Sequence, residues 1–181
     1  MGDIVNTTRH TRSLAIAFGL AAFAIAPSAA QSPARPGLDA GVTAPVSGYG
    51  SDKNLGYHIG LLVDVRIPGS VLGFRVDGAF TEIGYSGNQT KEDIWLVNAN
   101  ALLKVPTGKV IVPYAIGGFG IYNSHRTLFL ANNSSTDPGF NIGGGLRFER
   151  HDVTTFVEAR YHKVSGERDI RILPITFGLL F

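Results

Sequence analysis

Three residues near the C-terminus are of the types that hydrolytic enzymes use as acid, base and nucleophile: Glu158, His162 and Ser165. Their spacing argues against a shared catalytic site, because residues three apart in an extended strand point to opposite faces. His162 and Ser165 would lie on different sides of the backbone, whereas Glu158 and His162 would share one face. We therefore predict no catalytic residue and expect Glu158 and His162 to belong to a polar network.

Charged residues recur at alternate positions in several segments of the chain. Each lies opposite an apolar residue in a period-two pattern, so these side chains would all point to one face of their strands. Both signs are present, so the side chains can pair with one another and avoid the cost of unpaired burial. The predicted network consists of Asp64, Arg66, Arg75, Asp77, Arg147, Glu149, Glu158 and Arg160.

Metal, cofactor and nucleic-acid sites are not indicated by the sequence. The chain has no cysteine, and its five histidines show no ligand spacing. Its 16 basic and 14 acidic residues are spread along the chain, without the basic arm or acidic tail that would mark a nucleic-acid partner. We predict no metal, no cofactor and no nucleic-acid partner.

The segments that carry the charged residues have the pattern of long amphipathic β-strands. In segment 55–66, apolar residues at odd positions alternate with mostly polar residues and glycine over twelve positions. Seven such segments follow residue 54, and a weaker first one is inferred because bacterial barrels have an even number of strands. The predicted strands are 38–46, 55–66, 72–85, 94–105, 110–123, 140–148, 153–163 and 170–181.

The first 30 residues have the three parts of a secretory signal. Arg9 and Arg12 precede an apolar run at 14–26, and Pro27 is followed by small residues before a cleavage point after Ala30. The run of 13 residues is too short for a hydrocarbon core that needs about 20. The predicted organisation is a signal peptide at 1–30, a flexible leader at 31–37 and an outer-membrane β-barrel at 38–181.

Strand length, connection length and charge placement favour a membrane barrel over a soluble β-sandwich, which remains the alternative. The predicted strands have mostly about 10–14 residues, near the 9–11 that cross a bilayer and longer than the ~5–6 of soluble strands. Short connections alternate with longer polar ones, as periplasmic turns alternate with extracellular loops. The short ones are 67–71, 106–109 and 149–152, and the others are 47–54, 86–93, 124–138 and 165–169.

In such a barrel the apolar face meets lipid, so the charged face would line the lumen. Glycines on that face would leave room for the charged side chains, and aromatic residues near strand ends would form girdles at the membrane interfaces.

In segment 110–123, a bulge near Gly117 would bring all four large apolar residues to one side. Those four residues are Tyr114, Ile116, Phe119 and Ile121, and the predicted girdle is Tyr57, Tyr85, Trp95, Tyr122 and Tyr161.

The C-terminal region resembles the closing strands of the OmpA/OmpX-like family of small outer-membrane β-barrels. The similar segments are TFVEARY at 155–161 and LPITFGLLF at 173–181, preceded by VPYAIGGFG at 112–120 and FNIGGGLRF at 140–148. The resemblance implies an eight-stranded antiparallel up-and-down barrel in the bacterial outer membrane. It also implies that the barrel-assembly machinery reads the terminal strand, where Phe177, Leu179 and Phe181 fit the signal.

An eight-stranded barrel has an interior just wide enough for its own side chains, which argues against a wide channel. We predict a structural or surface-interaction protein whose partners are outer-membrane lipid and a surface ligand bound by the extracellular loops. Candidate contact residues lie in the longest loop, 124–138, although the simpler interpretation is that they extend the hairpin above the membrane. They are Arg126, Leu128, Phe129 and Leu130.

Two other functions stay open. A narrow ion pore gated by the interior salt bridges would change its conductance when Arg160 is replaced with alanine. A lipid A-modifying enzyme is the less favoured alternative, since lipid A deacylases of this size use a His and a Ser two residues apart. His162 and Ser165 are three apart. Hydrolysis of lipid A that is lost in His162→Ala would support the enzyme.

Overall fold

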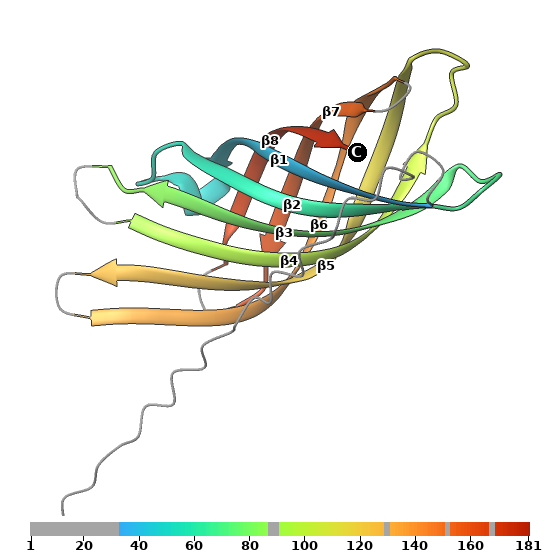
Figure 1. The fold of residues 1–181 in the computed structure, drawn as a ribbon. Coiled ribbons are helices and arrows are strands. Elements are labelled where there is room, and N and C mark those ends of the chain that lie inside the picture. The colour runs from blue at the N-terminus through green and yellow to red at the C-terminus, as the bar shows by residue number, and fades with distance from the viewer. Residues whose placement is uncertain (1–32, 87–90, 129–130, 151–152, 167–168) are drawn as a thin grey trace, which may run out of the picture.

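Eight antiparallel strands close into a barrel in the computed structural model (Figure 1). Each strand pairs with its neighbours in sequence, and β1 closes the sheet by pairing with β8. The structure describes residues 33–86, 91–128, 131–150, 153–166 and 169–181. The predicted eight-stranded up-and-down barrel is confirmed. Its strands are β1 (Ala34–Pro45), β2 (Gly56–Arg66), β3 (Leu72–Gly84), β4 (Lys91–Lys104), β5 (Ile111–Leu128), β6 (Ala131–Glu149), β7 (Thr154–Val164) and β8 (Arg171–Leu180).

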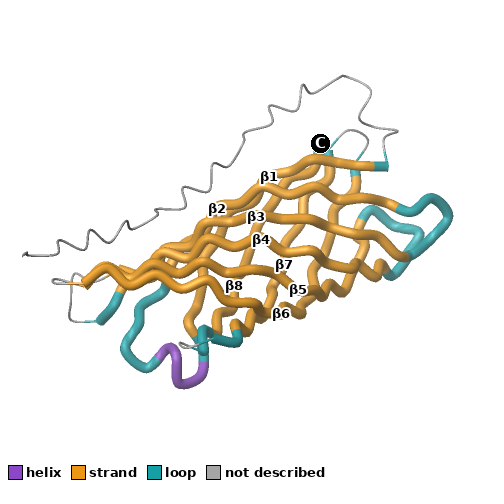
Figure 2. The backbone as a smooth tube through the Cα atoms, turned by 90° about the horizontal axis from the view of Figure 1, so that it is seen from below, coloured by secondary structure: helices purple, strands orange, loops and turns teal. Residues whose placement is uncertain are grey.

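The connections define two different ends of the barrel. The turn end holds three short connections, 67–71, 105–110 and 150–153, together with the start of β1 and the end of β8. The loop end holds the 46–55 connection, the β3–β4 and β7–β8 connections and the tip of the β5–β6 hairpin. A 3-10 helix, η2 (Ser47–Gly50), lies in the first of these and is visible at one end of Figure 2. In the described part of the chain, no helix has the length and apolar character needed to cross a membrane.

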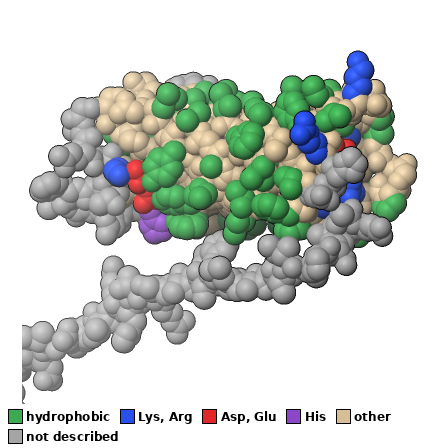
Figure 3. Space-filling model, turned by 45° about the horizontal axis from the view of Figure 1, so that its top comes forward, with side chains coloured by type: hydrophobic (Ala, Val, Ile, Leu, Met, Phe, Trp, Pro, Cys, Tyr) green, Lys and Arg blue, Asp and Glu red, His purple; other side chains and the backbone are tan. Residues whose placement is uncertain are grey.

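The strands alternate between an apolar outer face and a polar inner face. In β2, Leu61 is 67% exposed whereas its neighbour Leu62 is 3% exposed, and the buried face also holds His58 and Asp64. Figure 3 shows hydrophobic side chains spread over the strands, with charged side chains gathered near the two ends. This distribution is the reverse of a soluble protein and suits a barrel whose outer face contacts lipid.

Strand β1 begins earlier than the sequence suggested, so the flexible leader predicted at 31–37 is wrong over residues 34–37. These residues pair with β2 on one side, and Gly37 also pairs with Leu180 of β8. Proline suits an extended backbone because its fixed φ lies in that region. Arg35 holds the segment in place, since its guanidinium donates to Thr154 Oγ1 at 2.7 Å and to the Leu180 carbonyl at 3.2 Å. The predicted signal peptide lies outside the described residues.

The long loop predicted at 124–138 is instead the outer part of a β-hairpin. Strands β5 and β6 pair without interruption from Ile111 and Phe148 to Leu128 and Ala131. A cross-strand hydrogen bond of 2.7 Å joins Asn123 Nδ2 to Thr136 Oγ1. Because both faces of this part are polar, the apolar alternation that identifies a strand is missing. The interpretation that the candidate contact residues extend the hairpin is confirmed for Arg126 and Leu128, which lie in β5.

Strand β5 contains no bulge near Gly117, so that prediction is wrong. Its register with β4 and β6 is continuous, and Tyr114 and Ile116 point into the barrel while Phe119, 76% exposed, points outward. Two of the predicted girdle residues are also misplaced, because Tyr85 and Tyr122 are 6% and 1% exposed and lie inside. Their hydroxyls bond to interior polar groups, which favours the inner face.

Candidate functional site

Arg75 lies at the centre of an ion-pair chain inside the barrel. Its Nε is 2.6 Å from Asp64 Oδ1, and its Nη1 is 2.9 Å from Glu158 Oε2. Asp64 also accepts a hydrogen bond from Arg147 Nη2. All four side chains are at most 2% exposed. Strands β2, β3, β6 and β7 are therefore connected across the lumen by charge-assisted hydrogen bonds, which are stronger than neutral ones.

Arg160 extends the chain to the other side of the lumen. Its Nε lies 2.9 Å from Glu158 Oε1, and its Nη1 donates to Asp77 Oδ1 at 2.9 Å. Six of the eight residues in the predicted network thus form one chain of alternating sign, in the order Arg147, Asp64, Arg75, Glu158, Arg160 and Asp77. Three positive and three negative charges make it neutral, which limits the cost of burying them.

Arg66 and Glu149 are the other two residues of the predicted network, and they do not join the ion-pair chain. Both are half-buried near the turn end, and no ion pair between described residues connects them to the other six. Arg66 follows Asp64 by two residues, and a strand rises about 3.3 Å per residue, so its side chain starts nearer the turn end.

Neutral polar residues that the site prediction missed bind the end of the chain at Asp77. Asn98 Nδ2 and Asn100 Nδ2 donate to the two Asp77 oxygens at 2.9 and 2.7 Å. Tyr122 donates its hydroxyl hydrogen to Asn98 Oδ1 at 2.8 Å, and the Tyr122 hydroxyl oxygen lies 2.8 Å from His162 Nδ1. The sequence feature that could have identified these residues is their position in the alternating pattern, because each falls on the polar, inward-facing side of its strand.

Two further interior contacts involve residues that sequence reasoning did not include. Tyr114 donates to Glu158 Oε2 at 2.7 Å, so that oxygen receives two hydrogen bonds. His58 lies between Thr43 and Thr176, with its ring nitrogens 3.1 and 3.0 Å from their hydroxyl oxygens. Together with the residues above, these contacts bring side chains from all eight strands into the lumen.

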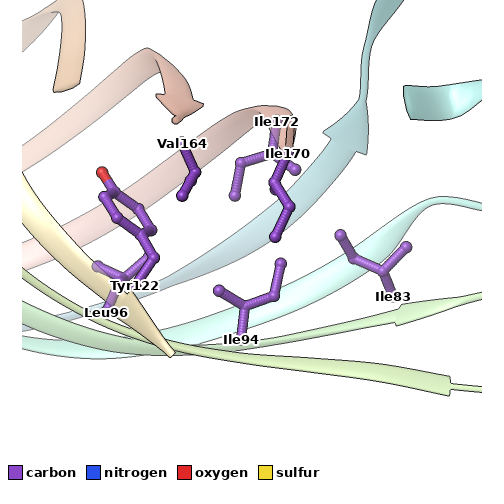
Figure 4. Close-up of a cluster of buried hydrophobic side chains, with 7 residues drawn as sticks. All are labelled: Ile83, Ile94, Leu96, Tyr122, Val164, Ile170 and Ile172. Carbon is purple, nitrogen blue, oxygen red and sulfur yellow. The ribbon is translucent and has the colours of Figure 1, made fainter. Parts of the chain in front are cut away.

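A cluster of buried apolar side chains lies inside the barrel, on the loop-end side of the ion-pair chain. Figure 4 shows the cluster. Its members come from β3, β4 and β5 on one side, and from β7, β8 and Ile170 just before β8 on the other, and they point toward one another. Tyr122 connects the two layers, because its ring packs in the cluster while its hydroxyl bonds to Asn98. We call this cluster the apolar plug, and it consists of Ile83, Ile94, Leu96, Tyr122, Val164, Ile170 and Ile172.

Above the plug, the loop end holds a group of aromatic and charged side chains. The Lys53 amine lies 3.7 Å from the centre of the Tyr49 ring and 3.9 Å from Glu92 Oε2. Tyr85 donates to Glu92 Oε2 at 2.7 Å, and burial together with this bond raises the pKa of Tyr85. An open hollow of about 350 Å³ beside this group is lined by Gly48, Tyr49, Asp52, Lys53, Asp169 and Arg171.

Two of the four predicted contact residues, Arg126 and Leu128, lie in the described part of the chain, at the outer end of β5. The Arg126 guanidinium lies 4.3 Å from the centre of the Tyr85 ring, and Leu128 is the last residue of β5. Phe129 and Leu130 lie outside the described residues.

The predicted assembly residues Phe177, Leu179 and Phe181 share the outward side of the C-terminal strand region, and Phe177 is 56% exposed.

His162 and Ser165 do not lie together in the structure. His162 is 1% exposed and faces the lumen, whereas Ser165 follows the end of β7 and is exposed. Ser165 contributes its backbone amide to the Pro138 carbonyl at 2.9 Å. Among the residues described, no group of His, Asp and Glu is placed to hold a metal ion.

Comparisons with known proteins agree with the barrel geometry. The profile of a family described as outer membrane protein beta-barrel domain matches residues 15–179. No curated protein sequence matches the chain. Three similar solved structures share the fold at 15–19% identity and each covers 81–82% of this chain.

Neisserial surface protein A (NspA) is 19% identical with a TM-score of 0.68 and is covered over 96% of its length. Ail, the attachment invasion locus protein of Yersinia pestis, is 15% identical with a TM-score of 0.57 and is covered over 95%. The outer membrane enzyme PagL is 16% identical with a TM-score of 0.52 and is covered over 98%.

Proposed function

Because the chain belongs to the family of outer membrane protein beta-barrel domains, we propose that it is a sealed scaffold of the bacterial outer membrane with a structural or surface-interaction role. The loop end faces the cell exterior, since extracellular loops are the longer connections in such barrels. The barrel anchors this end and carries no wide channel.

The observation that carries this proposal is the double closure of the lumen. The ion-pair chain crosses the middle of the barrel, and the apolar plug lies between it and the loop end. An ion that entered from the loop end and passed the charged group there would meet the dry surface of Ile94 and Ile172, which offers no ligands to replace its water. It would then meet guanidinium and carboxylate groups that already bind one another.

The fold alone does not choose between roles. Among the similar structures, Ail is described as an attachment invasion locus protein and PagL as an outer membrane enzyme. The buried position of His162, away from the exposed Ser165, favours the first kind of role over catalysis for this chain. We propose that contacts with other molecules are made at the loop end, with Arg126, Leu128, Phe129 and Leu130 of the β5–β6 hairpin as candidates.

Planar-bilayer recording tests the sealed lumen. We expect the wild-type barrel to show no steady current above that of the bare bilayer. Ile94→Ala and Arg160→Ala should each stay silent, because the other layer still closes the lumen. The combined variant should conduct, since both barriers are weakened.

A wild-type current that changes with Arg160→Ala alone would contradict the sealed scaffold and support the narrow pore. Phe119→Ala, on the outer face, is the matched control and should behave like wild type in every recording.

The C-terminal residues supply a test of assembly in cells. Phe177, Leu179 and Phe181 face outward together, as a signal read by the barrel-assembly machinery requires. We expect Phe181→Ala to lower the amount of folded barrel in the outer membrane several-fold while total synthesis stays the same. The measurement is heat-modifiable gel mobility of the membrane fraction. Val110→Ala at the turn end is the control, and an equal loss in both variants would count against the signal.

A further inference from the structure

Two positive side chains lie directly opposite each other on the outer face of β7 and β8. Lys163 pairs in register with Arg171, at the loop end of both strands. Both side chains follow the outward parity of their strands and are half-buried. Like charges placed directly opposite in an antiparallel ladder repel each other. The pair is therefore an electrostatic defect unless an anion lies between them.

The described part of the protein neutralises this pair only in part. Asp169 Oδ2 lies 2.5 Å from Arg171 Nη2, and its second oxygen accepts from Arg171 Nε at 3.3 Å. One carboxylate against two cations leaves a net positive charge. Among described residues, no carboxylate forms an ion pair with Lys163, whose ladder partner on the other side is Phe140.

The surroundings of the pair place it at the edge of the lipid-facing surface. Toward the middle of the barrel, the same outward face carries Ile142 and Ile175, which are 61% and 50% exposed. Tyr161 is the ladder partner of Ile142 and lies between the level of Ile175 and that of Lys163, where its ring and hydroxyl suit a membrane interface. Lys163 and Arg171 thus lie at the level where hydrocarbon gives way to lipid headgroups.

We propose that Lys163 and Arg171 bind an anionic phosphomonoester group of a lipid headgroup in the outer leaflet, of the kind that lipid A carries. A phosphate oxygen between the two side chains removes their repulsion, and an arginine fork matches phosphate geometry. The apolar residues below would contact the acyl chains of the same lipid, which favours a lipid over a free anion. This inference rests on the proposed function, because it requires the loop end to face the outer leaflet.

Titration with lipid A tests the site. The mature barrel is refolded into phosphatidylcholine nanodiscs that contain increasing fractions of bisphosphorylated lipid A, and its unfolding temperature is read from heat-modifiable gel mobility. We expect lipid A to raise this temperature in the wild type. The combined variant Lys163→Gln with Arg171→Gln should need about tenfold more lipid A for half of the rise, as expected for loss of charge-assisted hydrogen bonds.

Two single variants separate phosphate binding from simple packing. Lys163→Arg keeps the charge and should respond to lipid A like the wild type. Lys163→Glu creates an opposite-charge pair with Arg171, so it should raise the unfolding temperature in phosphatidylcholine alone and lose most of the response to lipid A. Lys109→Gln, exposed at the turn end, is the matched control and should leave the titration unchanged.

The proposal is overturned if the combined variant and the wild type respond alike. Dephosphorylated lipid A that raises the unfolding temperature equally would also overturn it, because acyl contacts would then suffice. So would an equal rise with inorganic phosphate in phosphatidylcholine alone, which would identify a free-anion site. A chain that never gives the heat-modifiable band would instead contradict the proposed membrane barrel, so the two failures are distinguishable.

Discussion

Replacing Arg75 with methionine is expected to lower the free energy of unfolding by about 3–5 kcal/mol, the usual cost of removing one partner from a buried ion pair. The change leaves the Asp64 and Glu158 carboxylates inside the lumen without their shared cation. Methionine fills most of the vacated volume against the Phe156 ring, whose centre lies 4.7 Å from the guanidinium carbon. The loss would therefore report mainly on charge. Urea unfolding of the barrel in phospholipid vesicles measures it.

A second substitution in the same chain provides the sharper comparison. Arg75→Met combined with Glu158→Gln removes one charge of each sign, while Asp64 keeps Arg147 and Asp77 keeps Arg160. We expect this neutral combination to recover at least half of the lost stability. Lys91→Met, which breaks the exposed pair with Glu82, should have little effect. If the single Arg75→Met variant is as stable as the wild type, the ion-pair chain does not stabilise the barrel.

Replacing Phe119 with arginine is expected to destabilise the barrel in vesicles by about 2–4 kcal/mol, as for a cation near the middle of a membrane strand. Phe119 is 76% exposed, and its ladder partner Ala99 lies in the middle part of β4. In a soluble sandwich the same change would place a charge in water at little cost. The sign and size of the effect therefore test whether this face contacts hydrocarbon.

The matched variant is Val110→Arg, at the turn end and 54% exposed. A cation near the interface costs about 0–1 kcal/mol, so this variant should be close to wild type. Phe119→Leu keeps an apolar side chain and should also unfold at nearly the same urea concentration. Equal destabilisation by the two arginine variants would contradict the assignment of β5 as membrane-spanning at Phe119.

The strands could be predicted from the sequence because the two faces of each strand meet different environments, lipid on the outside and the polar lumen on the inside. Leu61 and Leu62 show the limit of the pattern, because both are leucine although one is 67% and the other 3% exposed. Only the alternation of the neighbouring residues shows which of the two faces the lumen. Where both faces are polar, as in the outer part of the β5–β6 hairpin, the alternation disappears and the sequence does not distinguish the strand from a loop. Tyr85 and Tyr122 were misplaced because tyrosine suits a membrane interface and a polar lumen equally.

The sequence predicts which residues face the lumen, but it does not predict which of them contact one another. Alternation identifies inward-facing residues such as Asp64 and Arg147, but which of them meet depends on how far the strands are staggered around the closed barrel. That stagger brings together residues 83 positions apart. It also leaves Arg66 and Glu149 outside the chain, although their parity is the same. Neutral partners such as Asn98 and Tyr114 could not be identified in this way, because the prediction rested on charged residues.

The ion-pair chain has a consequence for how the protein folds. Three of its contacts, Arg75 with Glu158, Arg147 with Asp64 and Arg160 with Asp77, each span 83 residues and join the N-terminal strands to the C-terminal strands. Before closure, the three N-terminal members carry a net charge of −1 and the three C-terminal members +1, so the halves attract each other. These contacts are too distant in sequence to form early, because their loop-closure entropy is large. We therefore expect them to form when β1 meets β8 and to make closure of the barrel cooperative.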